Sequence, residues 1–290
     1  MKHLCMGLML IFNCVGQDFL LQFAKNSPHT TYYYVMSKVD ASLVLPEQIR
    51  SYKEDVTGVL KDSVFLEADS DGFNAHRLFT VEEYLLNGNK VEIPDYLSQL
   101  LDYRYFMHQH KGIRKKSINP DFDPLDVMEM NLVLPEKKVK VGDQWVAEYW
   151  ASLPVAGSEK IKLEGHWQLK SVKDEVAVLV GRFQAKASAT KSMPYAGLLR
   201  FMAEHRFSMA QGMIVEGKQS LDFRYESRTE LARLYSKEVT DGTRLGYRLK
   251  FMSDLRPMTE AAAVLRIPGH YAPIEFSPDL ESENESMDTE

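Results

Sequence analysis

Two histidines two positions apart form the pattern in this sequence that comes nearest to metal chemistry. His108 and His110 stand at positions i and i+2, so on a β-strand both imidazoles would share one face. With a third ligand from a neighbouring strand, the pair would hold zinc and support a metal-assisted hydrolase. Lys111 follows at once, a basic stretch covers 114–116, and the pair adjoins an expected hairpin turn. A solvated surface is therefore the favoured interpretation, and zinc chemistry is the alternative.

His205 is the second residue with chemical potential, because the alternation of its strand places it on an apolar face. It shares this face with Phe201 and Phe207. An imidazole on a dry face needs a hydrogen-bond partner or a wet cavity. The sequence leaves two interpretations open: a histidine satisfied within a packed core, or one that lines a ligand cavity.

Aromatic side chains on the expected strands could line such a cavity. Tyrosine and methionine suit adaptable apolar pockets, but the same side chains also fill a solid core. The sequence does not decide between the two arrangements. If the concavity exists, the residues that we expect to line it are Phe201, His205, Phe207, Phe223, Tyr225, Tyr247 and Phe251.

Motifs of the well-marked enzyme classes are absent from the sequence. It contains no Gly-x-Ser-x-Gly elbow, phosphate loop, dinucleotide fingerprint, His-Glu-x-x-His pair or paired-cysteine metal motif. We therefore expect a non-enzymatic protein without a cofactor.

Alternating apolar and polar residues predict the strands that must position these side chains. The pattern is clearest over 160–170, 199–209, 221–226 and 245–251. A turn at 172–175 and another at Gln211 and Gly212 separate consecutive strands. Long, half-exposed strands in succession predict an antiparallel meander and a mostly β fold.

The first half of the chain is less regular but similar in kind. Hairpin turns are expected at Asp71-Gly72 and Lys111-Gly112, and short helices at 94–101 and 259–265. The expected strands of this half are 18–23, 31–39, 47–55, 63–68, 73–81, 103–110 and 113–118.

One segment carries a family resemblance. Residues 134–145 read LPEKKVKVGDQW, which resembles the Leu-Pro…Val-Lys-Val-Gly-Asp-x-Trp segment of uncharacterised bacterial exported β proteins with a domain of unknown function. The strand-glycine-strand pattern over 103–118 and the hairpin at Gly212 also resemble the half-barrels of lipoprotein carriers and mycobacterial lipoproteins. The resemblance implies a strongly curved antiparallel sheet, a half-barrel or open barrel, with a few short helices. It implies a fold and a compartment rather than a reaction.

The N-terminal residues 1–16 have the layout of a short secretory signal peptide. Lys2 precedes an apolar run over 4–12, and small or polar residues lead to Gln17. Cleavage before Gln17 and lipidation at Cys14, as in a bacterial lipoprotein, are both open; a buried first strand of a cytoplasmic protein is the remaining alternative. Export predicts the periplasm or outer cell envelope of a bacterium. The run is shorter than the about 20 residues that cross a bilayer, so no transmembrane span is expected.

The charge distribution divides the chain into three parts. Its 290 residues carry 35 Lys and Arg against 41 Asp and Glu, a formal net charge of −6, which argues against a nucleic-acid partner. The stretch 277–290 is acidic without a base and is predicted to be a disordered tail. We therefore expect a signal peptide at 1–16, one antiparallel β domain at 17–276, and the tail. Leu-Val-Leu-Pro-Glu occurs at both 43–47 and 132–136, which leaves open two related halves with a boundary near residue 120.

These patterns together predict a non-enzymatic exported protein of the cell envelope. We expect it to bind or carry a hydrophobic small molecule or lipid in the concave face of its sheet. The alternatives are a metal-assisted hydrolase that uses His108 and His110, and a purely structural envelope module whose sheet has a solid core. The sequence names neither the ligand nor a protein partner.

Overall fold

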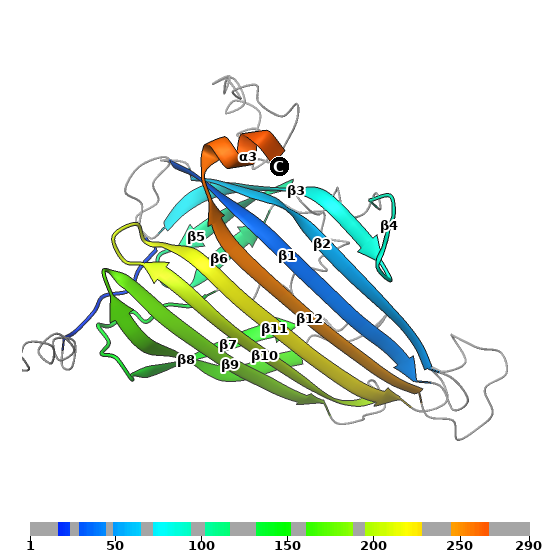
Figure 1. Ribbon diagram of the computed structural model, residues 1–290. Helices are drawn as coiled ribbons and strands as arrows, with labels where there is room; N and C mark the ends of the chain where they lie inside the picture. Colours follow the sequence, from blue (N-terminus) through cyan, green and yellow to red (C-terminus); the bar gives the residue numbers. More distant parts are fainter. Residues whose placement is uncertain are drawn as a thin grey trace, which may run out of the picture.

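The structure is a computed structural model, and strands make up most of it (Figure 1). It describes residues 17–23, 29–44, 49–64, 72–93, 102–116, 132–151, 161–187, 195–227 and 245–266. The predicted signal peptide with Cys14, the expected helix at 94–101 and the acidic tail lie outside these residues. The strands are β1 (His29–Val44), β2 (Ile49–Val64), β3 (Gly72–Leu86), β4 (Asn89–Lys90), β5 (Asp102–His108), β6 (Gly112–Lys116), β7 (Gln144–Ala151), β8 (Ile161–Lys173), β9 (Val176–Ala187), β10 (Tyr195–Ser208), β11 (Met213–Ser227) and β12 (Leu245–Met258).

All these strands belong to one antiparallel sheet. Their order is β6-β5-β3-β2-β1-β12-β11-β10-β9-β8-β7, and β4 pairs with β3 off this path. The first strand, β1, thus lies in the middle of the sheet, and the following strands run outward to the edge strand β6. The next strand, β7, forms the opposite edge, and the strands after it return to the middle, where β12 pairs with β1. Among the described residues the two edge strands β6 and β7 do not pair with each other, so the sheet is open. The prediction of a mostly β, antiparallel fold is confirmed.

Phe23 shows that the sheet curls around its inner face. Its backbone N–H donates to the carbonyl of Gln109, just after β5, at 2.9 Å. Its ring lies 5.5 Å from the ring of Phe207 on β10. β5 and β10 are six positions apart in the sheet order, which would be about 29 Å in a flat sheet at about 4.8 Å per strand. One residue reaches both only because the sheet curls, and Figure 1 shows β5 and β6 behind the long front strands.

The expected strand at 18–23 is wrong, because only Phe19 makes a β-bridge there, to Val139. The two residues exchange backbone hydrogen bonds of 2.8 and 2.9 Å. Phe19, Leu21 and Phe23 are all buried in the core. The alternation in the sequence therefore records burial against the inner face of the sheet, without a neighbouring strand.

The prediction of two separate strands at 47–55 and 63–68 is also wrong, because one strand, β2, runs without a break from Ile49 to Val64. A β-bulge between Thr57 and Gly58 shifts the register with β3. The bulge disturbs the alternation of side chains at this point. A β-carbon on Gly58 would clash with the backbone carbonyl of Thr80 and lie 2.8 Å from the ring of Phe79, so glycine makes room for both.

The 134–145 segment leads into the edge strand β7. Gly142, with a φ of 100°, turns the chain, and its N–H donates to the carbonyl of Leu169 at 2.8 Å. Trp145 follows in β7, and its indole N–H donates to the carbonyl of Val133 at 2.7 Å. The indole is thus fixed against the segment that precedes its own strand.

The expected helix at 259–265 is confirmed as α3 (Glu260–Arg266). The Thr259 hydroxyl accepts from the N–H of Ala262 at 3.3 Å, as an N-cap does. Ala263 is buried with Tyr32 and Val59 in a small second cluster. Among the residues that the structure describes, no helix is long and apolar enough to cross a membrane.

Candidate ligand-binding site

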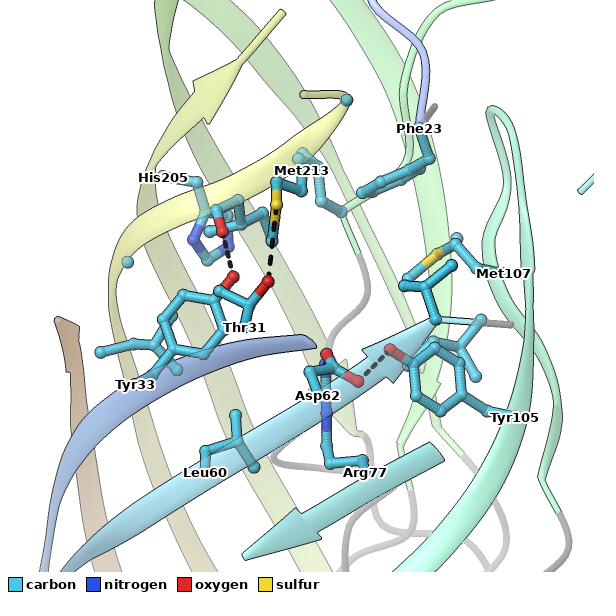
Figure 2. Close-up of a pocket in the computed structure, with 18 of the residues that line it drawn as sticks. Phe23, Thr31, Tyr33, Leu60, Asp62, Arg77, Tyr105, Met107, His205 and Met213 are labelled. Carbon is cyan, nitrogen blue, oxygen red and sulfur yellow. Dashed lines mark hydrogen bonds and ion pairs between the residues drawn. The ribbon is translucent and has the colours of Figure 1, made fainter. Parts of the chain in front are cut away.

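A cavity of about 180 Å³ lies on the inner face of the sheet (Figure 2). Strands β1, β2, β3, β5 and β6 line it on one side, and β10, β11 and β12 on the other. Phe23, Leu132 and Gly212, which lie outside the strands, complete the lining, which is mainly apolar. The polar lining residues are Thr31, Tyr33, Asp62, Arg77, Tyr105, His205, Gln219 and Ser253.

An ion pair with a tyrosine occupies the β2, β3 and β5 side of the cavity. Asp62 on β2 is paired with Arg77 on β3 in the register. The Oδ2 atom of Asp62 accepts from Nη2 of Arg77 at 2.7 Å, and Oδ1 accepts from the hydroxyl of Tyr105 at 2.7 Å. The guanidinium carbon of Arg77 also lies 5.1 Å from the centre of the Tyr105 ring. Both carboxylate oxygens are therefore engaged, which offsets the cost of burying the charges.

The two tyrosines of the cavity are hydrogen-bond donors. Burial raises the pKa of the Tyr105 hydroxyl well above its usual value, and the Asp62 carboxylate raises it further. Burial and then Asp62 raise the pKa of Tyr33 in the same way. Both hydroxyls stay protonated at neutral pH, and Tyr33 donates to the carbonyl of Ile214 at 2.6 Å. This bond ties β1 to β11 beside the cavity.

His205 faces the same cavity from β10. Its side chain is 7% exposed, and its ring lies 5.5 Å from that of Trp167, tilted by 30°. Gly217 of β11 is directly opposite in the register. A β-carbon at Gly217 would lie 2.7 Å from Nδ1 of His205. Glycine at this position therefore makes room for the imidazole.

The imidazole of His205 is neutral and incompletely bonded. Burial lowers the pKa of His205 to about 4. Within the described residues, its Nδ1 atom is buried and has no hydrogen-bond partner. A buried polar atom without a partner costs about 1–3 kcal/mol. This nitrogen is therefore a place where a polar atom of a ligand would gain a hydrogen bond.

The carboxylate that lines the cavity is bonded to groups other than His205. A histidine that acts as a general base is commonly oriented by a carboxylate. Here both oxygens of Asp62 already bond to Arg77 and Tyr105. Ser253 lines the cavity as well, but its hydroxyl accepts from that of Ser37 at 3.3 Å.

The predicted aromatic residues lie mostly beside the cavity rather than on it. Of the predicted ligand-binding residues whose side chains the structure describes, His205 is the one that lines the cavity. The four phenylalanines are buried in the main hydrophobic cluster: Phe201, Phe207, Phe223 and Phe251. The backbones of Tyr225 and Tyr247 pair between β11 and β12, but the positions of their side chains lie outside the described structure.

The His108 and His110 pair is placed at the turn between β5 and β6. The Nδ1 atom of His108 accepts from the backbone N–H of His110 at 3.1 Å and from that of Lys111 at 3.2 Å. The carbonyl of His110 accepts from the N–H of Leu134 at 2.7 Å. In the part of the chain that the structure describes, no three His, Cys, Asp or Glu side chains are grouped as a metal site would require. The contacts of the pair hold the turn in place.

Asp62, Arg77 and Tyr105 are site residues that the sequence reasoning missed. Alternation in β2 puts Leu60, Asp62 and Val64 on one face, and all three line the cavity. The ion pair could have been found from the sequence by one signal. Each of two neighbouring strands has a single charged residue on an otherwise apolar face, and the two charges are opposite in sign. The division of β2 into two expected strands hid this signal.

Part of the chain is similar in sequence to an uncharacterised protein family. Residues 125–229 match a family of unknown function, DUF6263. The matched range includes the 134–145 segment and runs to the end of β11. The match supports the expectation of an uncharacterised domain. No curated protein matches the chain.

Proposed function

We propose that this protein is a non-enzymatic protein of the cell envelope that binds a hydrophobic molecule in the cavity on the inner face of its sheet. The cavity supports this proposal, because strands from both halves of the sheet, β1 to β3 with β5 and β6, and β10 to β12, contribute its apolar walls. Ligand pockets commonly combine such walls with a few polar groups that orient the ligand. The ion pair of Asp62 and Arg77, with His205 across the cavity, supplies those groups.

The volume bounds the part of the ligand that enters. The cavity of about 180 Å³ is slightly larger than an engineered apolar cavity of about 150 Å³ that binds benzene. We therefore expect one ring or a short chain to fill it, roughly seven to nine non-hydrogen atoms. A longer molecule would place only its end inside.

Native mass spectrometry of the protein purified from its own host tests the proposal, together with organic extraction of the bound material. We expect an added mass that extraction removes. The Val64→Phe variant puts a ring into the cavity, because Val64 lines it, and it should carry no such mass. Val146→Phe makes the same change at a side chain that is 75% exposed on β7, and it should keep the ligand. An added mass that is equal in both variants would place the ligand elsewhere.

We propose export to the periplasm or outer envelope of a bacterium on the layout of residues 1–16. The intact mass of the mature protein tests this. A start at Gln17 indicates cleavage, and a diacylated or triacylated Cys14 indicates a lipoprotein. A chain that retains residues 1–16 in the cytoplasm would refute export.

A further inference from the structure

The charges that line the cavity are already matched to one another. Asp62 accepts from Arg77 and from Tyr105, each at 2.7 Å. The side chains of Arg77 and Asp62 are only 21% and 14% exposed. Because the two charges neutralise each other, a ligand anion would meet Asp62 as well as Arg77, and a ligand cation would meet Arg77 as well as Asp62. Either would bring a further charge into an apolar space where the ion pair leaves no net charge to balance it, which is costly.

His205 adds no charge to the cavity but offers a hydrogen bond. Burial lowers the pKa of this imidazole to about 4, so it is neutral at pH 7. Its Nδ1 atom is buried and, among the described residues, has no hydrogen-bond partner. Figure 2 shows the side chain reaching from β10 toward Tyr33 and Thr31. The position opposite is Gly217, so backbone without a side chain lies next to Nδ1 there.

A hydroxyl group matches this nitrogen whichever tautomer the imidazole adopts. It donates to Nδ1 when the ring proton is on Nε2, and it accepts when the proton is on Nδ1. A carboxylate can only accept, and an ammonium group can only donate. Both also bring a charge that the paired Asp62 and Arg77 do not neutralise.

We infer that the cavity selects an uncharged ligand whose hydroxyl group hydrogen-bonds to Nδ1 of His205. This inference rests on the proposed function and names the chemical class of the ligand: a small alcohol or phenol, or a longer molecule with such an end. Asp62, Arg77 and Tyr105 line the cavity as well, and their ion pair has no net charge that would balance an ionic group of the ligand.

Four probes of one ring size test the inference at pH 7: toluene, benzyl alcohol, benzoate and benzylamine, which is a cation at this pH. Affinities are measured by calorimetry on the full chain. We expect benzyl alcohol to bind about tenfold more tightly than toluene, the gain from one hydrogen bond to a buried group. Benzoate and the benzylammonium ion should bind at least about tenfold more weakly than benzyl alcohol, because each brings an unmatched charge.

A matched pair of variants assigns the preference to one atom. His205→Phe keeps a ring but removes Nδ1, so benzyl alcohol should fall to the affinity of toluene. His166→Phe makes the same change at a half-buried histidine that does not line the cavity, and it should keep the wild-type ranking. The ranking in the wild-type protein does not depend on whether either variant folds.

The outcomes separate the inference from the proposed function. Benzoate or benzylammonium binding as tightly as benzyl alcohol would overturn the inference and leave a hydrophobic ligand site in place. An unchanged preference for benzyl alcohol in a folded His205→Phe variant would also overturn it. If none of the four probes binds, or if Val64→Phe does not weaken toluene, the proposed cavity function itself fails.

Discussion

The neutral state of buried His205 makes the stability of the protein depend on pH in a defined window. The pKa of this side chain falls from an ordinary value of 6.5 to about 4 on folding, because burial penalises the charged imidazole. As pH drops below 6.5, the unfolded chain binds a proton that the folded protein does not. The contribution of His205 to stability is therefore complete above pH 6.5 and is lost as pH falls toward 4.

The size of the loss follows from the pKa difference. A change from 6.5 to about 4 corresponds to about 3 kcal/mol of unfolding free energy, at about 1.4 kcal/mol per pKa unit. At pH 5.5, one unit below the ordinary value, the loss should be about 1 kcal/mol. Little further loss from this residue is expected below pH 4.

Urea unfolding, followed by tryptophan fluorescence, measures this effect. The free energy of unfolding is compared between the wild type and His205→Phe at pH 7, 5.5 and 4.5, so that contributions of other titrating groups cancel. The stability of the wild type relative to the variant should decrease by about 1.4 kcal/mol per pH unit below 6.5. His166→Phe, the same change at a histidine that does not line the cavity, is measured alongside as the control. A difference between wild type and His205→Phe that stays constant from pH 7 to 4.5 would refute the reasoning.

Two further predictions concern stability. Asp62→Asn leaves Arg77 without a carboxylate and should lower the free energy of unfolding by about 2 kcal/mol, less than for a fully buried pair because both side chains are partly exposed. The double variant Asp62→Leu with Arg77→Leu removes both charges and should unfold at higher urea than Asp62→Asn. A double variant that is less stable than Asp62→Asn would show that these charges stabilise the protein through contacts other than their own ion pair. Gly181→Ala would put a β-carbon 2.7 Å from the ring of Trp167 and should cost about 1–3 kcal/mol in urea unfolding by overpacking; an unchanged unfolding midpoint would mean that the indole shifts freely.

The fold was predictable where side chains alternate between solvent and one shared core. β10 illustrates this, because Phe201, His205 and Phe207 are buried on the face that the sequence pattern assigns to them. The pattern failed at 18–23, where buried residues alternate without a partner strand, and in β2, where a bulge at Gly58 shifts the register.

The candidate site was predictable only in part, because its walls meet through the curl of the sheet. Tyr33 and Ile214 are 181 positions apart in the chain, yet they share a hydrogen bond beside the cavity. Strand patterns indicate which face of a strand is dry, and they do not indicate which dry faces oppose each other. His205 was found because a polar residue on a dry face is conspicuous within a single strand. Asp62 and Arg77 become a recognisable site only when β2 and β3 are paired.

The pairing of β1 with β12 has a consequence for how the chain reaches this structure. Residue contacts such as that between Ser37 and Ser253 join positions 216 residues apart. Strand pairing at such separation is slow, because the entropy of closing a long loop is lost before the contacts form. At about 5–20 residues per second, synthesis of the chain between these strands takes roughly 10–40 s. Throughout that interval one edge of β1 lacks its partner, and an unpaired edge readily joins other chains. Of the described strands, the one that completes the middle of the sheet is thus the last to be synthesised.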